Sequence, residues 1–194
     1  MKKLVIKTAL ITLLSVILVF GITFGSLCLF APKTVARVFD GVGNYSAAVF
    51  FYQKDYEKTN NIEDLAFIID KAYSKQDDAL AKDLLKKMIE HSDFSAYCSR
   101  QDVSGEMSTR EYYYGYYVIT LARAGEDATA ISVCETFVLD FGYTEFNPYR
   151  PLVNEIKGGS AERKTALKNS LDSIKDNLDT TERALLDADY SKLI

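Results

Sequence analysis

Residues 8–30 contain no charged side chain, and nearly every position in this stretch is apolar or small. A helix rises about 1.5 Å per residue, and about 20 consecutive apolar residues cross the hydrocarbon layer of a bilayer. The stretch therefore predicts a helix that crosses a membrane once. Gly21 and Gly25 stand four residues apart within it, a spacing that lets two membrane helices approach closely, so it also predicts a weak homodimer.

A cleaved secretory signal peptide is the alternative interpretation of the same stretch. The apolar run is longer than the core of about 7–15 residues that signal peptides carry. Cleavage after the small residue Ala31 is disfavoured because Pro32 follows it directly. We therefore expect an uncleaved signal anchor over residues 8–30, and secretion after cleavage remains the alternative.

Positively charged residues near the ends of a membrane helix favour the cytoplasmic side. Lys2, Lys3 and Lys7 precede the apolar stretch, and Lys33 and Arg37 follow it. This bias predicts a single-pass protein of the cell membrane, with a short cytoplasmic tail at residues 1–7. The C-terminal domain would then lie outside the cytoplasm.

The chain that follows the apolar stretch is acidic. The whole chain has a net charge of −4 and its first 31 residues carry +3, so the remainder carries −7. Nucleic acids bind basic surfaces, and this charge therefore argues against nucleic acid as a partner.

Ligands for a metal ion are sparse. His91 is the only histidine, and Cys28, Cys98 and Cys134 belong to no CxxC pattern, so we expect no metal site. A disulfide between Cys98 and Cys134 stays open, because a domain outside the cytosol permits one. Cys134 lies on an apolar stripe and is expected in the core, whereas Cys98 lies in a polar segment that would expose its thiol.

Catalysis requires convergent groups at fixed spacing, and the chain has no GxSxG, HExxH or GxxxxGK[ST] run. His91 follows a helical stripe, where a histidine interacts favourably with the helix dipole. The paired acidic residues stand at breaks between stripes, where they cap helices. We therefore expect neither enzymatic activity nor a bound cofactor.

Apolar residues after the anchor recur three and four positions apart, and alternating β-branched runs are few, so the sequence predicts an all-α fold. Residues 113–121 are apolar on most sides, as in a buried helix. The other stripes are Tyr45, Ala48, Val49, Tyr52 and Tyr56; Leu65, Ile68, Ile69, Ala72 and Tyr73; Leu80, Leu84, Leu85, Met88 and Ile89; and Ile131, Cys134, Phe137, Val138 and Phe141.

Breaks of helix-ending and helix-capping residues separate these stripes. They fall at Gly43-Asn44, Asn60-Asn61, Gln76-Asp77-Asp78, Gly125-Glu126-Asp127 and Gly142. Residues 92–107 form a longer polar connection with Ser104-Gly105 near its end, and Asn147-Pro148 and Arg150-Pro151 mark another irregular stretch. After the break at Gly158-Gly159-Ser160, one face of a further helix carries Leu167, Leu171, Ile174 and Leu178.

A repeat emerges when these breaks are aligned. The turns at Gly43 and Asp77 lie 34 residues apart, and a small residue, Ala48, Ala81 or Ala130, follows each turn at the middle of the next helix. The run Gly43-Asn44-Tyr45-Ser46-Ala47-Ala48 resembles the turn of the tetratricopeptide repeat family. The prolines that usually close each unit are absent here.

The resemblance implies an array of about three helical hairpins over residues 32–142, with residues 92–107 as a polar insert. Residues 143–194 would form a linker and C-terminal capping helices that cover the last apolar face of the array. Stacked hairpins of this kind leave a concave groove, and the first helix of each unit lines it in the family.

Five tyrosines between 112 and 117 cannot all face the core, because successive residues turn by about 100° around a helix. When the sequence is aligned with the family, one face of the third unit points toward the groove. Part of the second unit points toward the same groove. Tyrosine and arginine are favoured at interfaces. The partner-binding residues that this alignment predicts are Phe67, Lys71, Lys75, Tyr112, Tyr116 and Arg123.

Two functions fit this organisation. The first is a membrane-tethered scaffold or adaptor that binds a protein partner on the concave face of the array, with the bilayer contacting residues 8–30. The second is a permanent structural subunit of a larger membrane complex. A large apolar patch on the isolated domain would favour the second.

Overall fold

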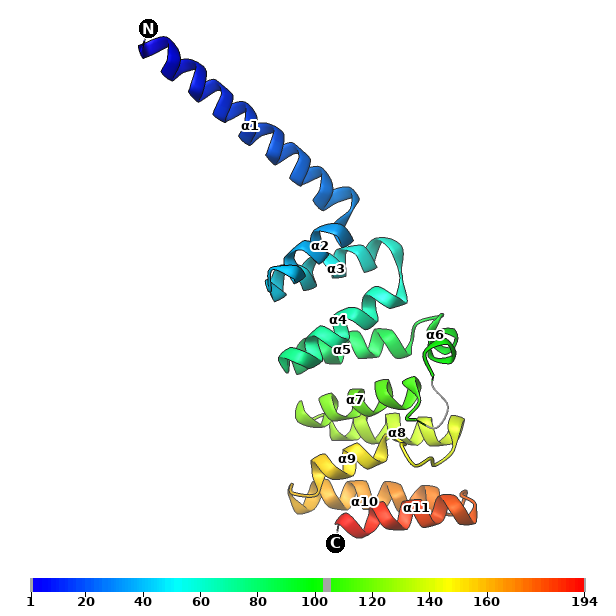
Figure 1. The fold of residues 1–194 in the computed structure, drawn as a ribbon. Coiled ribbons are helices and arrows are strands. Elements are labelled where there is room, and N and C mark those ends of the chain that lie inside the picture. Colours follow the sequence, from blue (N-terminus) through cyan, green and yellow to red (C-terminus); the bar gives the residue numbers. More distant parts are fainter. Residues whose placement is uncertain (1, 103–105, 194) are drawn as a thin grey trace. The chain divides into compact units, whose positions relative to one another are not determined.

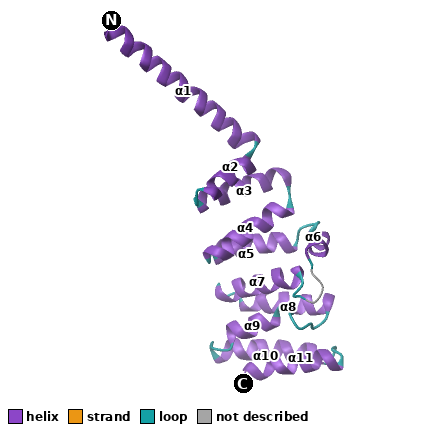
Figure 2. Ribbon diagram, in the orientation of Figure 1, coloured by secondary structure: helices purple, strands orange, loops and turns teal. Residues whose placement is uncertain are grey.

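The computed structural model describes residues 2–102 and 106–193 (Figure 1). It is 82% helical, and the described residues contain eleven α-helices and no strand (Figure 2). The predicted all-α fold class is therefore confirmed. The expected break at Ser104-Gly105 lies outside the described residues.

The helices follow one another with short connections. Their bounds are α1 (Lys2–Phe30), α2 (Pro32–Gly41), α3 (Tyr45–Thr59), α4 (Ile62–Lys75), α5 (Asp78–Ile89), α6 (Phe94–Gln101), α7 (Thr109–Arg123), α8 (Asp127–Phe141), α9 (Tyr149–Ile156), α10 (Ala161–Lys175) and α11 (Thr180–Tyr190), and a short 3₁₀ turn, Ser191–Leu193, follows.

Helix α1 contains a 25-residue stretch, Ile6–Phe30, that is long and apolar enough to cross a membrane; no other described helix has both properties. Its described apolar side chains are largely exposed, as in Phe20 and Leu29. Thr12 and Thr23 donate their hydroxyls to the carbonyls of Thr8 and Val19, at 3.0 and 2.8 Å. Such bonds satisfy polar side chains that have no water to contact.

The chain divides into two compact units, Met1–Lys71 and Ala72–Ile194, and the division falls within α4. In the first unit α2 and α3 form an antiparallel hairpin, and α1 contacts α2. The core of this unit comes from α2, α3 and the first ten residues of α4. Its fully buried side chains include Ala36, Leu65, Ile68 and Ile69.

The second unit is organised around α7, which packs against α5, α6, α8 and α9. Nine of its fifteen residues are buried, which agrees with the apolar character predicted for residues 113–121. Helices α10 and α11 contact α8, α9 and each other. Leu167, Leu171, Ile174 and Leu178 are all buried there, so the predicted apolar face of the helix after Ser160 is confirmed.

Three turns share one geometry. Gly43, Gln76 and Gly125 have positive φ angles of 75°, 55° and 78°, and each precedes the N-cap residue of the next helix. A buried alanine, Ala48, Ala81 or Ala130, stands five positions after each turn residue. The sequence alignment of Gly43 with Asp77 is thus off by one residue, because Gln76 occupies the left-handed position.

The connections between the apolar stripes contain helices that the sequence interpretation does not include. The polar connection contains α6, whose buried Phe94, Tyr97 and Cys98 have helical spacing. The expected irregular stretch contains α9, which accommodates Pro151 because the first turn of a helix needs no internal N–H donors. Tyr73, the last residue of its apolar stripe, is 58% exposed.

Candidate partner-binding site

A capping box starts the helix that carries the tyrosines. The Ser108 hydroxyl accepts a hydrogen bond from the Glu111 amide at 3.2 Å, and the Glu111 carboxylate accepts one from the Ser108 amide at 2.8 Å. One turn later Gly115 faces α9, and a Cβ at this position would meet Cγ of Pro151 at 3.4 Å, which is a van der Waals contact. The capping box fixes the start of α7.

The tyrosines of α7 point in different directions. Tyr113 packs against Phe94 and Tyr97 of α6, with ring centroids 6.1 and 6.2 Å away. Tyr114 meets Phe137 of α8 at 5.0 Å. These two rings therefore serve packing rather than a partner surface.

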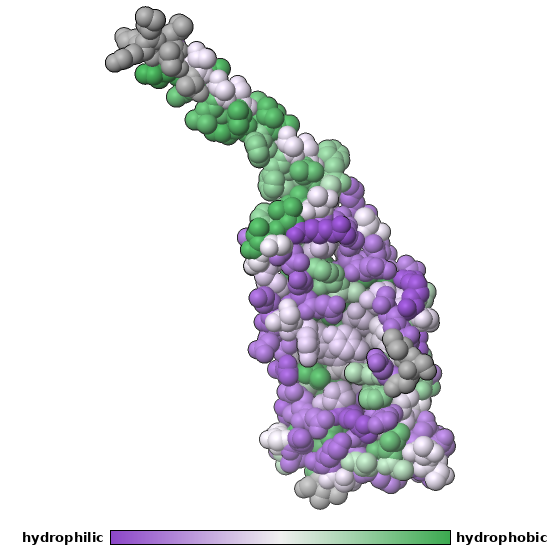
Figure 3. Space-filling model, viewed as in Figure 1, coloured by the Kyte–Doolittle hydropathy of each residue, from purple (hydrophilic) through white to green (hydrophobic). Residues whose placement is uncertain are grey.

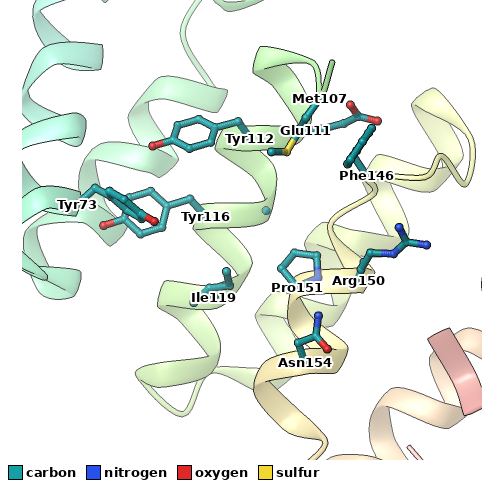
Figure 4. A pocket seen from close by; sticks show the side chains of 11 residues that line it. Tyr73, Met107, Glu111, Tyr112, Tyr116, Ile119, Phe146, Arg150, Pro151 and Asn154 are labelled. Atoms are coloured by element: carbon teal, nitrogen blue, oxygen red, sulfur yellow. The ribbon is translucent and has the colours of Figure 1, made fainter. Parts of the chain in front are cut away.

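A cavity of about 320 Å³ lies between α7 and α9 (Figure 4). Tyr112 and Tyr116 extend along one side of it, and Pro151 and Asn154 of α9 face them across the gap. Met107 and Phe146 stand near one end. The complete lining is Tyr73, Met107, Glu111, Tyr112, Gly115, Tyr116, Ile119, Phe146, Arg150, Pro151 and Asn154.

The charged groups of this lining have partners within the fold. The Glu111 carboxylate accepts hydrogen bonds from Ser108 and Thr144. The guanidinium of Arg150 points away from the tyrosines in Figure 4, and its Nε lies 3.4 Å from the buried carboxylate of Asp189. What remains for a ligand is a mainly apolar and aromatic wall.

Tyr116 contributes a polar group to this wall. Its side chain is 6% exposed and stacks edge-to-face with Tyr73, with ring centroids 5.1 Å apart. The hydroxyl is buried and has no hydrogen-bond partner among the described residues. Burial, and then the negative charge of Asp78, raise the pKa of Tyr116, so the hydroxyl stays protonated and able to donate.

A second cavity of about 690 Å³ shares the lining residues Tyr73 and Tyr116 with the first, so the two adjoin, and we refer to the pair as the groove along α7. Its lining is polar and includes Ser74, Gln76, Asp78 and Arg123. Arg123 bonds to Asp78 at 3.1 Å and lies 3.4 Å from Glu155. The combined groove therefore runs from an apolar end to an end with paired charges.

The sequence-predicted residues fall into two groups. Tyr112 and Tyr116 line the first cavity, and Tyr116 and Arg123 line the second. Lys75 is exposed on α4 and lines neither cavity. The role of all these residues in binding a partner stays a prediction.

Phe67 and Lys71 lie in the other compact unit. Phe67 packs against Tyr52 with ring centroids 4.3 Å apart. Lys71 lies over the ring of Phe67 and bonds to Asp40 at 2.6 Å. Both side chains thus have packing roles within the first unit.

The sequence interpretation does not place Tyr73, Met107, Phe146 or Pro151 at a partner site, nor Glu111, Arg150 and Asn154. Tyr73 belongs there to an apolar stripe, and Met107, Phe146 and Pro151 belong to connections or to a helix that the prolines concealed. Only Phe146 carried a usable signal, since a large aromatic side chain within a stretch read as irregular suggests an anchored loop.

The cysteines offer no reactive thiol. All three are free, so Cys98 and Cys134 are not bonded to each other. Cys98 is buried rather than exposed as expected, and burial raises its pKa to about 11. Cys134 is also buried, with a pKa raised for the same reason. Within the described residues, no group of three or more His, Cys, Asp or Glu side chains could hold a metal ion.

Comparison with known proteins does not place the chain in a family. No protein-family model, curated protein or solved structure matches it. The resemblance to tetratricopeptide repeats therefore stays a prediction, and the groove along α7 is the feature from which a function can be proposed.

Proposed function

We propose that this chain is a single-pass membrane protein whose helical body binds a protein partner in the groove along α7. The single observation that carries the proposal is the position of the exposed apolar side chains in Ala72–Ile194. The large ones among the described residues are Tyr73, Met107, Leu139, Phe141 and Phe146, and three of these five line the apolar cavity. Apolar exposure that converges on a concave site is typical of binding sites.

The tether is α1. Its Ile6–Phe30 segment matches a bilayer in length and composition, and the lysines before it favour a cytoplasmic N-terminus. Gly21 and Gly25 leave open space on its surface, which would allow a weak homodimer through this face. Protease added to intact cells should digest the helical body if it lies outside the cytoplasm, and a protected body would reverse this topology.

The architecture we propose is a short array of the tetratricopeptide type. Three features support it: the helix hairpins α2–α3 and α7–α8, the positive-φ residue at each of three turns, and the buried alanine five positions later. Helices α10 and α11 would cap the array. In such an array α7 is the first helix of its unit, the helix that presents side chains to a groove.

The groove favours a partner segment with one apolar anchor side chain followed by a polar or charged one. The apolar cavity holds about 320 Å³, enough for a side chain rather than a whole element. Next to it, the Tyr116 hydroxyl lacks a partner, and Asp78 and Arg123 offer both charges. A membrane tether raises the local concentration of such a module, so modest affinity suffices.

Site-specific photocrosslinking in intact cells tests the proposal. A photoreactive amino acid at Tyr112 or Ile119 should capture one defined protein, whereas the same group at the exposed Leu139 should not. Tyr112→Ala should then weaken capture about tenfold, as expected for an aromatic anchor. Equal capture from all three positions, or no effect of Tyr112→Ala, contradicts the groove as a binding site.

A permanent structural subunit is the second candidate, and Leu139 and Phe141 favour it. They are 75% and 40% exposed on α8 and line neither cavity along α7. If they are covered in a complex, crosslinks from Leu139 should dominate and should survive purification in detergent. A transient partner at the groove predicts the reverse pattern.

A further inference from the structure

The α2–α3 hairpin has one covered face. Lys33 of α2 forms an ion pair with the buried Asp64 of α4, and Asp40 of α2 bonds to Lys71 of α4. From α3, Tyr52 packs against Phe67 of α4. All of these residues belong to the first compact unit, so α4 covers one side of its hairpin.

The opposite face carries exposed apolar side chains. On α2, Val38 lies about 140° around the helix axis from Lys33. Val42, the C-cap residue that follows α2, stands four residues after Val38. On α3, Phe50 lies about 200° from Tyr52. The three are 61%, 73% and 49% exposed, and we refer to Val38, Val42 and Phe50 as the open face.

Lysines border the open face on the side of α1. Lys54 holds its ammonium 4.8 Å from the centre of the Phe50 ring. One turn later, Lys58 donates to the carbonyl of Phe30, the last residue of α1, at 3.4 Å. The basic border is therefore joined to the end of the membrane-length helix, where Leu29 and Phe30 are themselves 69% and 77% exposed.

The end of a helical repeat array normally has a polar outer face that keeps it soluble. Here the first hairpin exposes Val38, Val42 and Phe50 among polar side chains, and α1 contacts the same hairpin through α2. Figure 3 shows the apolar surface of α1 reaching the helices that follow it. Apolar side chains bordered by lysines are what an element lying in a membrane interface requires, because the lysine stems reach past the apolar layer to the phosphates.

We propose that the open face rests in the headgroup region of the bilayer that α1 spans, with Lys54 and Lys58 directed at lipid phosphates. The inference rests on the proposed membrane anchor and adds a second contact with the same bilayer. Contact of the hairpin with the bilayer would fix the angle at which the helical body leaves the membrane. A connection through the single residue Ala31 would not fix that angle by itself.

The chain contains no tryptophan, so a single introduced tryptophan reports its own surroundings. Three variants of the full chain, Phe50→Trp, Phe20→Trp in α1 and Leu139→Trp in α8, are reconstituted separately. The vesicles contain phosphatidylcholine and phosphatidylglycerol, with or without bromine on the acyl chains near the headgroups. Iodide added to the water is the opposing quencher. Circular dichroism checks that each variant is folded, and all three positions are exposed at the surface of the chain.

Brominated lipid should lower the fluorescence of Phe50→Trp roughly twofold, as expected for a side chain about 5–10 Å into the boundary between headgroups and acyl chains. Iodide should have little effect on it. Phe20→Trp should also respond to brominated lipid, and Leu139→Trp should respond only to iodide. Lys54→Gln combined with Lys58→Gln should reduce the lipid quenching of Phe50→Trp.

Each other outcome overturns the inference in a distinct way. If Phe20→Trp is quenched by lipid but Phe50→Trp only by iodide, the anchor stands and the open face lies in water. If Phe50→Trp is shielded from both quenchers, a second copy or another protein covers the face. If Phe20→Trp does not respond to brominated lipid, the membrane anchor of the proposed function fails as well.

Discussion

The compact units Met1–Lys71 and Ala72–Ile194 are both built from paired helices, yet their exposed apolar side chains are arranged differently. In the first unit, Val38, Val42 and Phe50 lie beside a membrane-length helix and are bordered by lysines. In the second, the exposed apolar residues converge on a cavity along α7. Apolar surface beside an anchor fits lipid, whereas apolar surface that lines a cavity fits a partner's side chain.

The net charges of the two units also differ, at +2 for the first unit and −6 for the second. The excess in the first unit comes from Lys2, Lys3 and Lys7 at the start of α1, and residues 32–71, which carry the open face, have a net charge of −1. Net charge therefore does not separate a lipid contact from a partner contact. The difference between the units is where their exposed apolar side chains lie.

Each unit buries two carboxylates, Asp55 and Asp64 in the first and Glu111 and Asp189 in the second, and the more deeply buried one of each pair has different surroundings. Asp189 is fully buried and is contacted by the Tyr143 hydroxyl at 3.1 Å, Lys192 at 2.7 Å and Arg150 at 3.4 Å. Asp64 is 2% exposed, is paired with Lys33, and has the carboxylate of Asp55 as a neighbour. The second unit therefore depends more on its buried charge than the first.

The largest effect that we expect comes from Asp189→Ala. It would leave the Tyr143 hydroxyl without its acceptor and remove the carboxylate that the charges of Lys192 and Arg150 face, at a cost of about 3–5 kcal/mol in the free energy of unfolding. Asp64→Asn should change stability far less at neutral pH, because Lys33 is 34% exposed and can be solvated. Urea unfolding in detergent, followed by circular dichroism, measures both values.

Asp187→Ala is the matched control for Asp189→Ala. Asp187 lies on the same helix and bonds to Lys175 at 2.6 Å, but it is 57% exposed. Exposed ion pairs contribute about 0–1 kcal/mol, so its loss should be small. If the two substitutions lower the free energy of unfolding equally, burial of Asp189 is not the reason for its contribution to stability.

The sequence predicted most helices because their apolar stripes are long and regular. It missed α9 because Pro148 and Pro151 look like breakers, although a proline in the first turn costs a helix nothing. It misread α6 because only one face of that eight-residue helix is apolar, as Phe94, Tyr97 and Cys98 show. Short helices depend on tertiary contacts, which a local pattern does not contain.

The candidate site was less accessible from the sequence. Tyr112 and Tyr116 could be selected because five tyrosines cannot all face one core. Phe67 and Lys71 pack within the first unit, and their assignment to a partner site stays a prediction. Residues such as Met107 and Phe146 come from connections, whose positions follow no period and are fixed only by packing.

A smaller effect concerns the equivalent turns of the two units. Gly43→Ala in the first unit should lower stability by about 1 kcal/mol, because its φ of 75° is strained for any residue with a Cβ. Gln76 adopts the same region with φ 55°, so Gln76→Gly in the second unit should raise stability by about 0.5 kcal/mol. Thermal unfolding in detergent compares the two variants.

Gly41→Ala supplies the reference for these turns. Gly41 ends α2 without a positive φ, and open space surrounds the position of its Cβ. We expect no loss of stability there. A loss similar to that of Gly43→Ala would show that the turn geometry does not cause the effect.

The smallest effect that we expect is a dependence of stability on pH, and it concerns the buried carboxylate of Asp64 in the first unit. Burial raises the pKa of Asp64, and the Asp55 carboxylate adds to the rise against the opposing influence of Lys33. An acid whose pKa is higher in the folded than in the unfolded state binds more protons when folded, so its contribution to stability grows as pH falls through the folded pKa. Below the unfolded value of about 3.8 the contribution is constant.

Hydrogen exchange of α3 and α4, corrected for the intrinsic rate at each pH, measures this local response. The wild-type chain should gain protection there as the pH falls through the folded pKa of Asp64 toward about 3.8. Asp64→Asn removes this titrating group and should reduce that gain, and Asp70 of α4, whose pKa burial also raises, supplies what remains. If both chains instead lose protection equally, burial of Asp64 does not govern the acid response of the first unit, and this electrostatic contrast with the second unit is wrong.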